Sequence, residues 1–149
     1  MKKPCLPINP SLATSYDNLA LTYGDLGEHQ KALEFSLKAL AIREKVLPSD
    51  HPDLAISYHN LSTIYFYLGE HQKALEFSLK ALAIREKVLP GDHPDLVTSY
   101  NNLASIYGKL GEHQKQLEFN LKALAIREKT LPADHADLAS SSIMLATLM

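Results

Sequence analysis

The apolar positions of this chain follow helical spacing, in two patterns that alternate. Along 54–68 they recur at steps of three and four residues, which is the spacing of one face of an α-helix. Along 70–88 they lie nearly all round a helix, as expected where a helix contacts neighbours on several sides. The alternation predicts pairs of helices in an all-α fold.

Polar residues and glycines mark where these helices begin and end. We expect Asp50 to cap the helix that starts near Pro52, because its carboxylate can accept from an early backbone N–H. Gly69 is expected to end that helix, because glycine adopts the left-handed conformation at little cost. Along the whole chain these signals predict helices near 11–26, 29–46, 53–68, 71–88, 95–110, 113–130 and 137–148.

A block of sequence recurs at a fixed spacing of 42 residues. Residues 27–40 return unchanged at 69–82, and return at 111–124 with Gln116 and Asn120 as the differences. A fixed period in this range is typical of a solenoid, in which each unit buries its apolar face against its neighbours. We therefore expect one array over 1–149, with repeats at 9–50, 51–92 and 93–134 and a partial fourth repeat at 135–149.

The first helix of each unit carries a family signature. Tyr58, Leu61, Ser62 and Tyr65 have the spacing of the tetratricopeptide pattern W-x₂-L-G-x₂-Y, with Tyr in place of Trp and Ser in place of Gly. The chain therefore resembles the tetratricopeptide repeat proteins. HEAT and armadillo repeats, the alternatives of similar length, lack this signature.

The second helix of each unit indicates which type of tetratricopeptide repeat the chain resembles. Ala74 and Ala81 occupy the small-residue positions of the pattern, and the stretch 81–96 is similar to the 42-residue repeats of kinesin light chains. This resemblance implies a right-handed α-solenoid of stacked helix pairs, about three and a half repeats long, that acts in protein–protein interaction. The heptad coiled coil that a kinesin light chain also has is absent from this sequence.

Composition narrows the classes of partner. Lys and Arg number 15 against 17 Asp and Glu, and a net charge of −2 gives no basis for nucleic-acid binding. The longest purely apolar helical run, 39–42, is far too short to cross a bilayer, so no membrane partner is expected. Cys5 is the single cysteine and cannot form an internal disulfide, which favours a cytoplasmic setting. We expect a protein or peptide partner.

Catalytic and metal-binding patterns are weak. Six of the seven histidines recur with the repeat, so each is separated from its copy by a whole unit. The sequence has no His-x₃-His pair, cysteine cluster, phosphate loop or nucleophile elbow. We therefore expect no enzyme activity, no metal site and no cofactor.

Comparison of the repeats with one another separates a constant frame from a variable face. In the second helices 3 of 21 columns vary, against 8 of 16 in the first helices. Five of those eight fall on one side of the helix at about 100° per residue, the side that faces the concave groove of tetratricopeptide arrays, as the resemblance implies. A binding surface would give this pattern, and so would free drift of solvent-facing positions. The columns are Thr14/Ile56/Thr98, Asp17/His59/Asn101, Leu21/Thr63/Ser105, Gly24/Phe66/Gly108 and Asp25/Tyr67/Lys109.

One column of this face is constant. Asn18, Asn60 and Asn102 repeat in each complete unit, and an Asn amide has donors and an acceptor that can hold an extended peptide backbone. Similar asparagines line the cargo groove of kinesin-light-chain repeats, so the resemblance implies a ladder of three. Bonding to neighbouring helices, or recent duplication, would also keep the column constant.

The middle unit carries the bulky residues of this face. Space left by the glycines of the flanking units predicts an anchor pocket beside Phe66 for an apolar side chain of the partner. The alternative is that Phe66 packs on a neighbouring helix. The predicted peptide-groove residues are Asn18, Asn60, Asn102, Ile56, His59, Thr63, Phe66, Tyr67, Asn101, Ser105 and Lys109.

The charges of this face do not favour an acidic partner. Kinesin-type grooves favour acidic peptides, but Asp17 and Asp25 carry the wrong sign for one, with only Lys109 and His59 in support. We therefore do not predict an acidic motif, and we expect an extended peptide bound at micromolar affinity, about −8 kcal/mol.

The last residues of the chain predict a second surface. Solenoids need polar end caps, but this chain ends on the apolar residues Ile143, Met144, Leu145, Leu148 and Met149. We expect either a homodimer through this C-terminal helix or a longer natural chain. The second hypothesis on function is accordingly a structural or assembly unit that stacks or dimerises through its ends, with no groove ligand.

Overall fold

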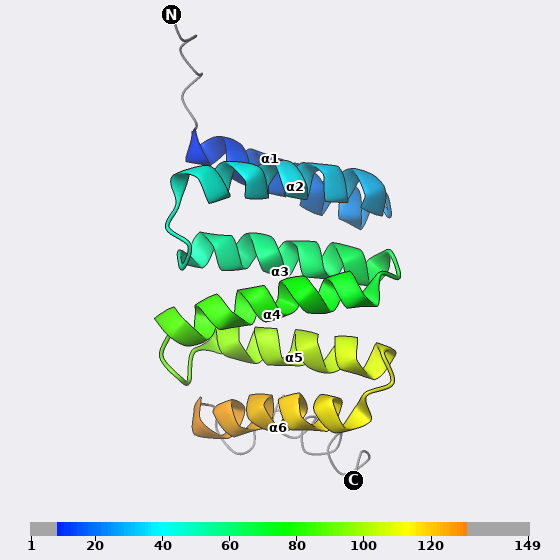
Figure 1. Ribbon diagram of the computed structural model, residues 1–149, viewed down its shortest axis with the longest axis vertical. Helices are drawn as coiled ribbons and strands as arrows, with labels where there is room; N and C mark the ends of the chain where they lie inside the picture. Colours follow the sequence, from blue (N-terminus) through cyan, green and yellow to red (C-terminus); the bar gives the residue numbers. More distant parts are fainter. Residues whose placement is uncertain (1–8, 131–149) are drawn as a thin grey trace, which may run out of the picture.

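The fold is an all-α helical-repeat solenoid, as the sequence predicts. The computed structural model describes residues 9–130, and Figure 1 shows its helices stacked in one file from α1 to α6. Each first helix packs against its second helix, and each second helix packs against the next pair. The helices are α1 Pro10–Asp25, α2 His29–Val46, α3 Pro52–Tyr67, α4 His71–Val88, α5 Pro94–Lys109 and α6 His113–Thr130.

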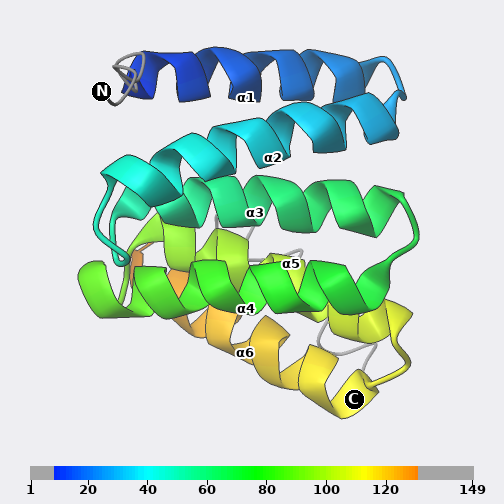
Figure 2. The ribbon, with the colours of Figure 1, turned by 45° about the horizontal axis from the view of Figure 1, so that its top comes forward.

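The predicted helix bounds are confirmed within about one residue for all six, and the helix predicted at 137–148 lies outside the described residues. Within each pair, the turn is made by a glycine in the left-handed region, at φ +81° for Gly27, +82° for Gly69 and +80° for Gly111. The role predicted for Gly69 is therefore confirmed. Figure 2 shows how these tight turns send each second helix back along its partner.

The predicted cap of α3 was wrong by one residue. His51, not Asp50, caps the helix, because its Nδ1 accepts from the backbone N–H of Asp53 at 3.0 Å. The residue before a proline is pushed into extended backbone, and the φ of −67° and ψ of 135° at His51 place its ring beside that N–H. Asp50 instead forms an ion pair with Lys87 at 3.5 Å.

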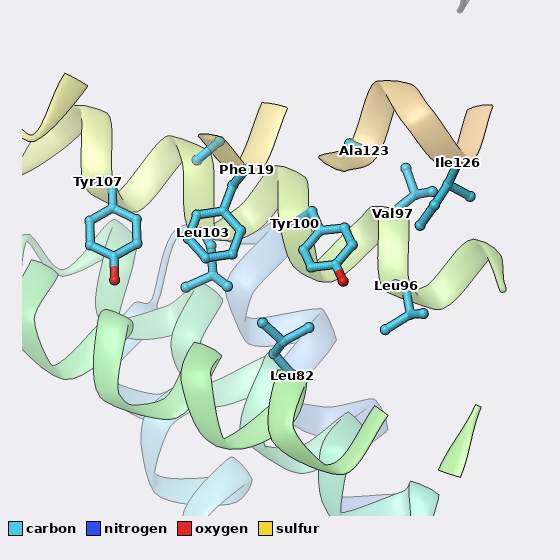
Figure 3. Packing of buried hydrophobic residues seen from close by; sticks show 10 residues of the cluster. Leu82, Leu96, Val97, Tyr100, Leu103, Tyr107, Phe119, Ala123 and Ile126 are labelled. Atoms are coloured by element: carbon cyan, nitrogen blue, oxygen red, sulfur yellow. The ribbon is translucent and has the colours of Figure 1, made fainter. Parts of the chain in front are cut away.

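The core is a row of aromatic and aliphatic layers between the helices. Figure 3 shows one layer, in which Phe119 of α6 lies against Tyr107 and Tyr100 of α5. The ring centroids of Phe119 and Tyr107 are 5.7 Å apart, and Phe119 is 7% exposed. Burial of a side chain of this size contributes roughly 1.5–3 kcal/mol. The same stack recurs between the equivalent rings of the first two helix pairs.

Two hydrogen bonds between consecutive helix pairs repeat along the stack. Arg43 donates from Nη1 to Ser57 Oγ at 2.6 Å, and Arg85 donates to Ser99 Oγ at 2.7 Å. The Tyr58 hydroxyl donates to Glu44, and the equivalent Tyr100 donates to Glu86. Burial and these glutamates raise the pKa of both tyrosines. The repeated bonds fix how one pair sits on the next, and so hold the surface of the first helices in place.

Candidate functional site

A groove of about 980 Å³ is hollowed between the first helices of the first two pairs, α1 and α3. Helix α2 contributes three residues to it. The residues from α1 are Thr14, Asp17, Asn18, Ala20, Leu21, Gly24 and Asp25; those from α2 are His29, Ser36 and Arg43; those from α3 are Asp53, Ile56, His59, Asn60, Thr63, Ile64 and Tyr67.

The variable face of the first helices is the face that lines this groove. All five variable columns contribute their α1 member, and four of the five also contribute their α3 member. Helical spacing explains this, because positions three, four and seven apart share one side of a helix. Six of the predicted peptide-groove residues therefore lie together: Asn18, Ile56, His59, Asn60, Thr63 and Tyr67.

The floor of the groove contains an ion pair that the sequence analysis missed. Arg43 is 7% exposed and donates from Nη1 both to Asp17 Oδ2 and to Ser57 Oγ. A buried charge needs such partners, because its removal from water is costly. Arg43 repeats in every unit, so a search for variable positions passes over it. The sequence signal for this pair is an arginine that recurs within an apolar stretch of each second helix, together with an aspartate, Asp17, on the variable face of the first helix.

Two polar atoms at this floor have no partner among residues 9–130. They are Asp17 Oδ1 and Ser36 Oγ, and the Ser36 side chain is almost completely buried. Buried polar atoms are nearly always hydrogen-bonded. The base of the first groove therefore holds two buried polar atoms that no described residue satisfies.

The three asparagines of the constant column differ in their surroundings. Asn18 and Asn60 line the groove, and neither side chain bonds to another described residue. Asn102 is used internally, because its Nδ2 donates to Ser62 Oγ and to Ser78 Oγ, each at 3.1 Å. The positions equivalent to those two serines, one repeat earlier, are Ala20 and Ser36. Ala20 lacks the hydroxyl that Ser62 provides, and Ser36 Oγ has no partner, so Asn60 makes neither of these bonds.

The two neighbouring aromatic residues of α3 point to different places. Tyr67 is 65% exposed, lines the groove, and stacks on His29 of α2 with ring centroids 5.2 Å apart. Phe66 instead packs on the core beside α4, edge-on to His71 at 5.2 Å, and is not among the groove-lining residues. Phe66 therefore packs on a neighbouring helix, the alternative to the predicted anchor pocket.

His59 is the groove residue whose charge state is most affected by the fold. Burial lowers its pKa, the nearby guanidinium of Arg85 lowers it further, and Asp95 of α5 acts in the opposite direction. His59 therefore remains neutral at pH 7 and contributes no positive charge to the groove. Burial also lowers the pKa of Arg85, again opposed by Asp95.

The remaining predicted residues lie elsewhere or outside the description. Asn101, Ser105 and Lys109 are on α5, one helix pair beyond this groove, where Ser105 and Lys109 are exposed and Asn101 is half-buried. The predicted oligomer-interface residues Ile143, Met144, Leu145, Leu148 and Met149 lie outside the described residues.

The described part of the chain offers little for metal chemistry or membrane insertion. No group of three or more His, Cys, Asp or Glu side chains in residues 9–130 could hold a metal ion. None of the six described helices combines the length and hydrophobicity needed to cross a membrane.

Comparison with known proteins agrees with this geometry. The pattern of the family described as "Tetratricopeptide repeat" matches residues 11–87 and 64–129. No curated protein sequence matches significantly. Among solved structures, the nearly identical TPR-like repeats of a candidate kinesin light chain from Podosopora anserina superpose with a TM-score of 0.83 at 34% identity, over 94% of this chain and 66% of that one.

Two further structures are similar. A single-substitution variant of the same Podosopora anserina repeats gives a TM-score of 0.82 at 34% identity, over 93% of this chain and 66% of that one. BtubC (BKLC) from P. vanneervenii gives 0.85 at 25% identity, over 99% of this chain and 58% of that one. The chain thus spans less than two thirds of the length of the structures it resembles.

Proposed function

The chain belongs to the tetratricopeptide repeat family, of the kinesin-light-chain type, and on that premise we propose that its groove binds an extended peptide segment of a partner protein. Repeats of this family are generally protein-interaction modules. The proposal places the peptide between α1 and α3, where Asn18 and Asn60 present free amides toward its backbone.

The observation that carries this proposal is the contrast between groove and frame. Nine of the ten α1 and α3 residues in the five variable columns of the first-helix face line the groove, whereas the residues that join one pair to the next are repeated. A rigid frame that presents a variable concave surface is suited to recognition, because little ordering entropy is lost on binding.

Selection from a random-peptide display library against the whole chain tests the proposal. We expect peptides of roughly micromolar affinity, with binding weakened at least fivefold by Asn18→Ala with Asn60→Ala. Glu34→Gln, on an exposed part of α2 outside the groove, is the matched control and should bind as the wild type does. Equal affinity of the double variant and the control would exclude the asparagines as the contact.

We further propose that binding takes place in the cytoplasm. The support is the lone Cys5, which leaves no internal disulfide that would call for an oxidising compartment. Fractionation of cells that carry the tagged protein should recover it with cytoplasmic markers, and recovery with secreted material would contradict this.

A further inference from the structure

Asp25 occupies an electrostatically unfavourable position at the end of α1. It is the last residue of the helix, where the partial charge of the backbone is negative, and no basic residue lies in that turn. Asp25 is exposed and makes no ion pair with any residue in 9–130. In the third pair the equivalent residue is Lys109, whose charge suits a helix C-terminus. Asp25 thus carries a negative charge that the fold leaves uncompensated.

Two exposed apolar side chains line the groove together with this carboxylate. Leu21 is 68% exposed and Tyr67 is 65% exposed, although both are large and line the same groove. A Cβ placed on Gly24, the residue before Asp25, would meet nothing within 4 Å, so the groove is open at Gly24. An exposed carboxylate next to exposed aliphatic and aromatic surface matches a side chain with an apolar stem and a cationic head.

The charges of the whole groove favour the same kind of ligand. Asp17 is offset by Arg43, which leaves Asp25 and Asp53 as the charged lining residues without an ion-pair partner in 9–130. Asp53 is stabilised by the N-terminus of α3. His59 is neutral because burial lowers its pKa, so it does not offset the carboxylates.

We propose that the Asp25 end of this groove binds a Lys or Arg side chain of the partner peptide. The cationic head meets Asp25, and the stem lies on Leu21 and Tyr67. This inference rests on the proposed function, because it names the chemistry of the peptide that the groove takes. It assigns the groove a basic ligand, opposite in sign to the acidic peptides that the kinesin-type resemblance implies.

Pools of acetylated and amidated octapeptides provide the test, with one fixed central residue and all other positions random. The fixed residue is Arg, Lys, Glu or citrulline, and citrulline keeps the shape of Arg without its charge. We expect the Arg and Lys pools to bind the wild-type chain about fivefold more tightly than the citrulline and Glu pools, as for one exposed charge pair. Because the pair is exposed, 1 M NaCl should remove most of this preference.

Variants of the chain locate the effect. Asp25→Asn should abolish the preference for Arg over citrulline, Asp25→Lys should reverse it toward Glu, and Asp92→Asn, in an exposed turn away from the groove, should leave it intact. Circular dichroism confirms that each variant is folded. If all pools bind wild type equally, or Asp25→Asn keeps the preference, this inference is wrong while peptide binding stands. If no pool binds wild type, the proposed function fails and this inference fails with it.

Discussion

The two interfaces between helix pairs are built on the same frame but differ in what they leave free. We call the contact of α1 and α2 with α3 and α4 the first interface, and the contact of α3 and α4 with α5 and α6 the second. Each contains an Arg-to-Ser bond and a Tyr-to-Glu bond. In the first interface the arginine, Arg43, also pairs with the carboxylate of Asp17. In the second interface the position equivalent to Asp17 is His59.

Single substitutions between repeats decide whether a shared position is bonded internally or left free at the groove. Asn102 is held by two hydroxyls in the second interface. In the first, Ala20 lacks one of these hydroxyls and Ser36 Oγ is unpartnered, so the Asn60 amide is free. Gln116 fills the space beside Gly108, whereas the space beside Gly24 is empty. A repeated frame therefore presents different side-chain chemistry at its two interfaces through a few residues that leave its geometry unchanged.

The largest expected effect is on the charged floor of the first interface. Asp17→Ala leaves the buried Arg43 without its carboxylate and should reduce the free energy of unfolding by about 3 kcal/mol. His59→Ala, at the equivalent position of the second interface, removes a neutral group and should cost less than about 1 kcal/mol. Urea unfolding of the two variants measures both. Equal losses would mean that Asp17 contributes nothing special to Arg43.

Substitutions at two asparagines of the constant column should affect different properties, stability for Asn102 and peptide binding for Asn60. Asn102→Ala removes the shared donor of two buried hydroxyls and should destabilise the chain by about 1–2 kcal/mol. Asn60→Ala should change the free energy of unfolding by less than about 0.5 kcal/mol and should weaken peptide binding instead. The comparison fails if Asn60→Ala proves as destabilising as Asn102→Ala in the same urea titration.

These differences separate the features that could be predicted from the sequence from those that could not. Helix bounds and glycine turns were predictable because they depend on residues within one or two turns of each other, and the groove face followed from helical spacing. The Asp17–Arg43 pair joins α1 to α2 across 26 positions, and the Asn102 bonds join α5 to α3 and α4 across 40 and 24 positions, so all of them depend on how separate helices pack together. The same reason explains why Phe66 and Tyr67, adjacent and both aromatic, could not be assigned to core and groove beforehand.

A smaller effect is expected at the glycines of the first and third pairs. Gly24→Ala should stabilise the chain by about 0.5–1 kcal/mol, because a helical alanine has less conformational entropy to lose and meets open space. Gly108→Ala should stabilise the chain less, because the new Cβ would lie 2.9 Å from Gln116 Nε2. Adding Gln116→Ala should restore the gain at 108. Thermal unfolding compares the three, and identical gains for both single variants would show that Gln116 moves aside freely.

The smallest expected effect is a pH dependence specific to the second interface. Because the pKa of His59 is lowered in the folded chain, the unfolded chain takes up a proton more readily as the pH falls below about 6.5. The contribution of neutral His59 to the free energy of unfolding is therefore present in full above that pH. It decreases as the pH is lowered toward the pKa of His59 in the folded chain. His59→Asn, which copies Asn101, should lose less stability between pH 7.5 and 5.0. Parallel losses in variant and wild type would contradict the role of His59.

Amide NMR of the wild-type chain, titrated with a peptide selected from the display library, tests most directly whether the groove of the first interface is the binding surface. We predict that shifted resonances concentrate on groove residues of α1 and α3, including Leu21, Asp25, Asn60 and Tyr67, while the exposed faces of α4 and α6 are unaffected. Shifts confined to those second-helix faces, with α1 and α3 unchanged, would contradict a peptide-binding groove.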